Sequence, residues 1–141
     1  TIRYVILKIN CAMEAPGFQV TRFKGHTNSI SSCAFLTDSS GKIKPTTVAT
    51  VGEDRRALLF DLRLPNPVYS LSHPNIDPES ISNILSDGIN QRCLFASGPT
   101  LFQMDLRKGS IDPLTPLTKG AGVTFLAFAG QIDSIAFCDE E

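Results

Sequence analysis

An internal repeat is the feature of this sequence that most constrains its fold. The segment LLFDLR ends at Arg63 and the segment LFQMDLR ends at Arg107, so Asp-Leu-Arg recurs after 44 residues. The apolar runs around each copy follow the same order: a first run ends near Phe35 or Leu85, a second has small residues at its centre, and a third ends in Asp-Leu-Arg. Self-similarity at a fixed period of this length indicates stacked copies of one structural unit.

The second run of each copy aligns through its small residues. These centres are Val48, Ala49 and Thr50 in the first copy and Phe95, Ala96 and Ser97 in the second copy. A third copy begins at residue 119, and Ala136 takes the place of the central alanine there.

Each apolar run has the character of a β-strand. Runs rich in β-branched and aromatic residues alternate with clusters of Gly, Pro, Asn, Asp and Ser, and no long segment has helical periodicity. With 42% hydrophobic and 19% charged residues, the composition is that of a globular domain rather than a disordered chain. The sequence therefore predicts an all-β chain of about twelve short strands. Between two of them, LTDSSGKIKPTT (residues 36–47) is expected to form a flexible exposed loop.

Residues 25–61, from Gly-His to Phe-Asp, resemble one complete WD repeat. Blades of that family carry Gly-His before the innermost strand and Trp-Asp at the end of the third strand. The match is good for this segment, partial for residues 74–107 and weaker elsewhere. The resemblance implies β-propeller blades of four antiparallel strands. It divides the chain into the end of one blade (1–24), a complete blade (25–73), a divergent blade (74–118) and the start of a further blade (119–141).

This division implies a partial ring. The strands are expected in groups of two, four, four and two, whereas propellers close with roughly four to eight blades. Either the chain is a fragment of a longer protein, or other copies or another protein fill the gap. We expect a fragment, because both cuts fall at exposed turn tips, where proteolysis concentrates.

The resemblance also implies a buried hydrogen-bond chain within the complete blade. It would run from His26 to Asp54 in a tight turn, then to Thr50, and end at the aromatic position Phe60. Phe60 preserves the packing but lacks the indole N–H of the family's tryptophan. We call this hydrogen-bond chain the brace. The second blade has no Gly-His and a shortened hairpin, so the brace is predicted to be absent there.

A catalytic triad is the alternative interpretation of the same residues. His26 and Asp54 could activate Thr50 or Ser31 as a nucleophile, but the sequence has no nucleophile elbow of the G-x-S-x-G kind. We therefore expect no catalytic residues.

The repeated Asp-Leu-Arg is the candidate docking site, at Asp61 and Arg63 in one blade and Asp105 and Arg107 in the next. Aspartate can order a turn, and arginine offers a rigid fork of donors to an acidic or carbonyl-rich partner. Tandem W-D-x-R motifs are typical of WD-repeat substrate receptors that dock on the adaptor of cullin ubiquitin ligases. The alternative is a solvated salt bridge within each blade, since both tryptophans are replaced here.

Other sites and partners are not indicated. The net charge of −1 and the scattered basic residues give no reason to expect nucleic acid, and no run is long and apolar enough to span a membrane. The four cysteines have no zinc-ligand spacing, so we expect neither metal nor cofactor. Disulfides are allowed, but buried free thiols of an intracellular protein, in the cytoplasm or nucleus, are the preferred interpretation. The cysteines are Cys11, Cys33, Cys93 and Cys138. Four aromatics are predicted to lie in the core: Phe23, Phe35, Phe125 and Phe128.

Taken together, these patterns predict a non-catalytic scaffold for protein–protein interaction. A substrate-receptor or adaptor subunit of a cullin ubiquitin ligase is the specific form that the arginine motifs favour. The alternatives are a structural subunit of a large intracellular assembly, or an enzyme with a propeller active site.

Overall fold

The computed structural model describes residues 6–10, 17–128 and 134–140, the first two strands by their backbone alone. Within these ranges the secondary structure consists of twelve strands and no helix, so the predicted all-β fold is confirmed. No helix capable of crossing a membrane occurs in the described part of the chain. The strands are β1 (Ile6–Asn10), β2 (Gly17–Thr21), β3 (Ile30–Thr37), β4 (Ile43–Gly52), β5 (Arg56–Asp61), β6 (Tyr69–Ser72), β7 (Leu85–Asp87), β8 (Arg92–Ser97), β9 (Thr100–Asp105), β10 (Ser110–Pro116), β11 (Val123–Phe128) and β12 (Ile135–Asp139).

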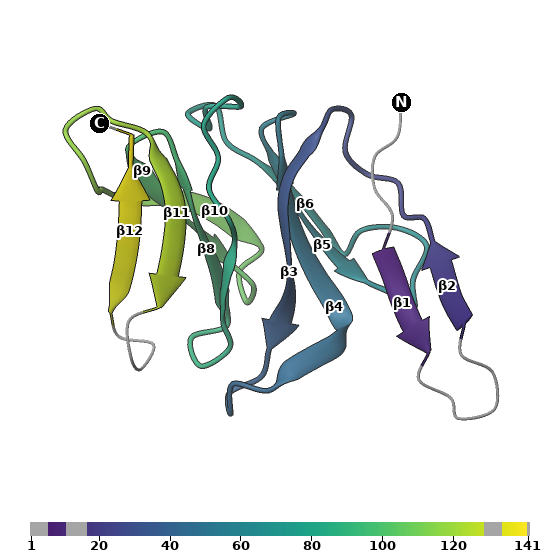
Figure 1. Cartoon of the computed structure of the whole chain (residues 1–141). Helices are drawn as coiled ribbons and strands as arrows, with labels where there is room; N and C mark the ends of the chain where they lie inside the picture. Colours follow the sequence, from purple (N-terminus) through teal and green to yellow (C-terminus); the bar gives the residue numbers. More distant parts are fainter. Residues whose placement is uncertain (1–5, 11–16, 129–133, 141) are drawn as a thin grey trace.

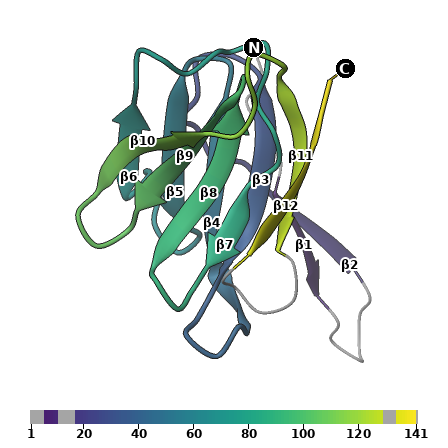
Figure 2. The ribbon, with the colours of Figure 1, turned by 90° about the vertical axis from the view of Figure 1, so that its left-hand side faces the viewer.

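The strands form four antiparallel sheets in which chain neighbours pair. The first four-stranded sheet has the order β3-β4-β5-β6 and the second has the order β10-β9-β8-β7, with two-stranded sheets β1-β2 and β11-β12 on either side. This grouping of two, four, four and two strands agrees with the prediction. Figure 1 shows the sheets side by side in chain order, and Figure 2 looks along that row from the β11-β12 end.

The sheets pack through faces of apolar side chains, as alternation along a strand requires. The largest buried cluster lies between the two four-stranded sheets; Ala49, Val51 and Leu59 contribute from one side and Phe95, Phe102 and Met104 from the other. A second cluster joins the opposite face of the second sheet to β11, with Leu94 and Leu126 both at or below 1% exposure. Each four-stranded sheet is therefore covered by the next sheet along the chain.

Hydrogen bonds between side chains and backbone connect neighbouring sheets through β3, the segment before β7 and β11. The Ser32 hydroxyl accepts from the Ile84 N–H at 3.0 Å. Asn83 makes a two-way contact with β11: its Oδ1 accepts from the Leu126 N–H at 2.7 Å, and its Nδ2 donates to the Leu126 carbonyl at 2.9 Å. Such bonds set the height of one sheet against the next, that is, its position along the strand direction, because each bond joins a particular residue pair.

The polar insertion at residues 36–47 is a hairpin rather than an irregular loop, and residues 39–45 are exposed as predicted. β3 extends to Thr37, β4 begins at Ile43, and Asp38 organises the turn by accepting from the Ser40 and Lys42 N–H groups. The hairpin also packs against the second sheet. A Cβ on Gly88 would overlap the Thr37 and Asp38 carbonyl oxygens, so only glycine fits there.

The predicted alignment of the second strands is wrong by two residues. Thr50 pairs with Leu58, which lies three residues before Asp61. In the second sheet, the residue three positions before Asp105 is Phe102, and it pairs with Phe95. Phe95, not Ser97, therefore occupies the position of Thr50. The shortened β8-β9 hairpin causes this shift, because it removes residues between the small-residue centre and the Asp-Leu-Arg turn.

Two of the four predicted core aromatics are exposed. Phe23 is buried and Phe128 is partly buried, but Phe35 is 42% and Phe125 is 53% exposed. Phe35 and Phe125 lie on β3, an edge strand of the first four-stranded sheet, and on β11 of the β11-β12 sheet. Alternation directs one side of each strand away from the inter-sheet clusters, so an aromatic residue in a strand is not by itself a core residue.

The prediction of buried cysteines holds for only one of the three described ones. All three are free thiols; Cys93 is buried, whereas Cys33 and Cys138 are exposed on β3 and β12. Burial raises the pKa of the Cys93 thiol to about 12, with a further contribution from Asp87. Cys11 lies outside the described residues.

Candidate functional site

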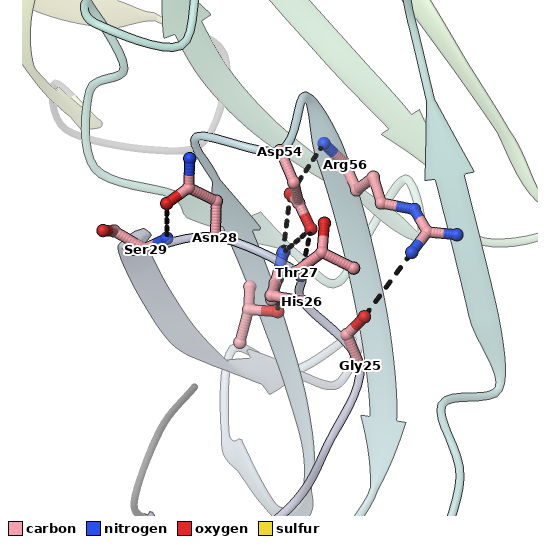
Figure 3. A network of polar contacts seen from close by, with 8 residues as sticks. Gly25, His26, Thr27, Asn28, Ser29, Asp54 and Arg56 are labelled. Atoms are coloured by element: carbon pink, nitrogen blue, oxygen red, sulfur yellow. Dashed lines mark hydrogen bonds and ion pairs between the residues drawn. The ribbon is translucent and has the colours of Figure 1, made fainter. Parts of the chain in front are cut away.

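The structure brings three of the four predicted brace residues into contact. His26, in the loop before β3, places Nδ1 2.9 and 3.0 Å from the two carboxylate oxygens of Asp54, in the turn between β4 and β5. Its Nε2 lies 2.8 Å from Oγ1 of Thr50 on β4. Figure 3 shows Asp54 above His26 and Thr27, with dashed lines marking the contacts of its carboxylate.

The chemistry of the three groups assigns their roles. A carboxylate can only accept, so Nδ1 of His26 donates to Asp54; in the neutral ring, Nε2 then accepts from the Thr50 hydroxyl. Asp54 also accepts from the backbone N–H groups of Thr27 (2.9 Å) and Arg56 (3.2 Å). One carboxylate thus connects the entering loop, the histidine and the start of β5.

The His26 ring and the Thr50 hydroxyl are both buried in this geometry. His26 is 4% and Thr50 is 3% exposed, so the hydroxyl that contacts the imidazole is covered by protein. A nucleophile has to reach a substrate carbonyl, and Thr50 cannot do so without local opening. Ser31, the other hydroxyl considered, lies on the exposed side of β3.

Phe60, the fourth predicted member, is a buried residue of β5. Its ring packs on Phe23 at a centroid distance of 5.9 Å, in a cluster that also contains Leu58. Because Phe23 precedes the His26 loop, this contact attaches the same loop to the sheet by apolar packing.

The first Asp-Leu-Arg turn contains an ion pair within the turn itself. Arg63 donates from Nε to Asp61 Oδ1 at 2.8 Å and from Nη2 to Asp61 Oδ2 at 2.6 Å, and its backbone N–H donates to Oδ1 at 3.0 Å. These bonds lower the pKa of Asp61 to about 2, and the bond from the Arg63 side chain is the largest cause. The Arg63 side chain is nevertheless 72% exposed, so the pair lies at the surface.

The second Asp-Leu-Arg turn is ordered differently. Asp105 Oδ1 accepts from the backbone N–H groups of Lys108 at 3.0 Å and Arg107 at 2.9 Å. These two backbone bonds are the main cause of the lowered pKa of Asp105. In the described part of the chain, the Arg107 guanidinium takes part in no ion pair.

The two turns occupy the same place in their sheets. Leu62 donates its N–H to the Thr46 carbonyl at 2.8 Å, and Leu106 donates to the Gln91 carbonyl at 3.0 Å. Both acceptors immediately precede the residue that pairs with the turn aspartate. The repeat in the sequence therefore corresponds to equivalent backbone positions in neighbouring sheets.

Several polar residues that stabilise the structure were not predicted. Asp87 is fully buried, and it accepts from Asn90 Nδ2 at 2.7 Å and from Arg92 Nε at 2.8 Å. The sequence shows only a turn there, because nothing in its pattern indicates that the aspartate points inward. The described residues contain no group of three His, Cys, Asp or Glu side chains that could hold a metal ion.

Comparison with known proteins gives no family assignment. No protein-family model matches the sequence, and no curated protein matches it significantly.

Removal of the buried contacts of His26 should destabilise the fold. We expect His26→Ala and Thr50→Val each to lower the free energy of unfolding by about 1–3 kcal/mol, because each leaves a buried polar partner without its hydrogen bond. Urea unfolding of the two single variants and the double variant measures the effect. Thr47→Val, on the same strand, is the matched control. Full additivity of the two changes would contradict a shared network.

The two turn aspartates should respond differently to loss of their arginines. The hydrogen bond from the Arg63 side chain is the main cause of the low pKa of Asp61, so Arg63→Ala should raise that pKa from about 2 toward the ordinary value of 3.8. Arg107→Ala should leave the pKa of Asp105 low, because backbone N–H groups are the main cause there. The Asp61 pair stabilises the folded state above the pKa of the unfolded chain, and its contribution is lost as the pH falls toward 2. NMR titration of the carboxyl carbons measures both values. Equal shifts in the two variants would contradict the assignment.

Proposed function

We propose that this chain is part of a WD-repeat-like β-propeller that serves as a non-catalytic scaffold for protein–protein interaction. The proposal rests on the four-stranded antiparallel sheets, their 44-residue repeat and the contacts of His26 with Asp54 and Thr50, which match what the resemblance implies. The observation that carries the interaction role is the pair of Asp-Leu-Arg turns at equivalent ends of neighbouring sheets. Residues that recur at one end of a rigid array present a surface with fixed spacing.

The partner that we propose is the adaptor of a cullin ubiquitin ligase, with this chain in a substrate-receptor or adaptor role. Support comes from Asp61, Arg63, Asp105 and Arg107, which stand where W-D-x-R motifs stand in such receptors. Phe60 and Met104 replace the two tryptophans. Both are buried, so the replacements alter the core below the turns rather than the exposed arginines.

Charge reversal at both turns should abolish binding without unfolding the chain. We expect Arg63→Glu with Arg107→Glu to weaken capture of the purified adaptor by roughly 30-fold or more, equivalent to the loss of about 2 kcal/mol at an interface. The melting temperature should change little, since an exposed ion pair contributes only about 0–1 kcal/mol to stability.

Lys44→Glu with Lys119→Glu is the matched control, because it reverses two exposed charges elsewhere. Retained binding by the arginine variant, or equal loss in the control, would rule out docking through these turns. A variant that loses stability but not its partner would show that Asp61 and Asp105 serve only their own sheets.

A further inference from the structure

The two Asp-Leu-Arg turns differ in how much of their positive charge is available. Two donor atoms of the Arg63 guanidinium are already bonded to Asp61, at 2.8 and 2.6 Å. In the second turn the Asp105 carboxylate is bonded to backbone N–H groups instead, and the side chains of Arg107 and Lys108 are exposed. Neither of these two cations forms an ion pair within the described residues. A partner carboxylate at Arg63 must compete with Asp61, whereas at Arg107 and Lys108 it need not.

Glycine allows the second turn to lie against the neighbouring sheet. Gly109 has φ +64°, and a Cβ there would lie 2.8 Å from Cε1 of the Tyr69 ring on β6. β6 and β10 are in contact, so the position of the turn against the first sheet is set by packing. Tyr69 is partly buried. Two cations thus lie on a turn that is packed against an aromatic ring.

We propose that residues 105–109, and not Asp61–Arg63, form the main contact with the partner, and that they bind an acidic peptide segment. The inference rests on the proposed docking function and assigns its charge chemistry to one turn. Arg107 can offer its guanidinium fork to a carboxylate and Lys108 adds a second charge, while the ring of Tyr69 offers apolar surface to a flanking side chain.

One acidic residue limits the direction of approach. Asp112 is exposed on β10, and its carboxylate accepts from the Ser110 hydroxyl at 2.9 Å. An acidic segment lying along β10 would meet this like charge. We therefore infer that the segment crosses the tip of the turn toward β6.

NMR titration of the ¹⁵N-labelled chain with a hexaglutamate peptide tests the proposal without the adaptor. At an ionic strength of about 20 mM, where screening is weak, the amide signals of residues 105–109 should shift. Arg107→Gln with Lys108→Gln should raise the dissociation constant roughly fivefold or more, because each charge pair at the surface contributes up to about 1 kcal/mol. Arg63→Gln is the matched control, and its dissociation constant should change less than about twofold, since its charge is already compensated by Asp61. Hexaglutamine should cause no shifts.

Three results would overturn the proposal: no shifts with hexaglutamate, shifts centred away from residues 105–109, or equal weakening in Arg63→Gln. Failure of the docking function has a different outcome. If hexaglutamate binds as expected but the purified adaptor does not, the acidic-segment site stands and the cullin-ligase adaptor is rejected as its partner.

Discussion

The apolar contact between the two four-stranded sheets is the interaction on which the remaining structure depends. Ala49, Val51 and Leu59 meet Phe95, Phe102 and Met104, and these side chains are at most 7% exposed. Burial of this face provides the favourable free energy, but apolar packing alone does not determine the height of one sheet against the next. Hydrogen bonds with specific partners, such as Ser32 with Ile84 and Asn83 with Leu126, do determine it. The spacing of the two Asp-Leu-Arg turns follows from this register.

The two four-stranded sheets use different contacts at an equivalent position of their second strands. At one register position, the first sheet has Thr50, whose hydroxyl contacts His26, and the second has Phe95, which stacks on Phe102 at 5.6 Å. The hydrogen-bonded contact requires every polar partner to be present, whereas the aromatic contact requires only side chains of suitable volume and shape. This difference explains how the second sheet can retain the strand order of the first without a Gly-His sequence.

Strands and their grouping could be predicted from the sequence because periodicity determines them. The length of a hairpin turn and the face on which a side chain lies could not. The strands and their grouping followed from alternation and from the repeated Asp-Leu-Arg. The Thr50 alignment was wrong because a shorter hairpin shifts a strand without changing its composition. Residue type predicts Phe35, Phe125 and the thiols of Cys33 and Cys138 in the core, yet all four side chains are exposed on their strands. The different states of Arg63 and Arg107 could not be predicted, because the same three residues form both turns.

Native-state hydrogen exchange followed by NMR tests the central claim most directly, namely that side-chain bonds between sheets hold the sheets in register. The critical amides are those of Ile84 and Leu126, which donate to the side chains of Ser32 and Asn83 rather than to a strand neighbour. The account predicts that both exchange as slowly as amides of the central strand β8, because they open only when the sheets separate. Exchange as fast as that of the exposed Ser40 turn amide would contradict it.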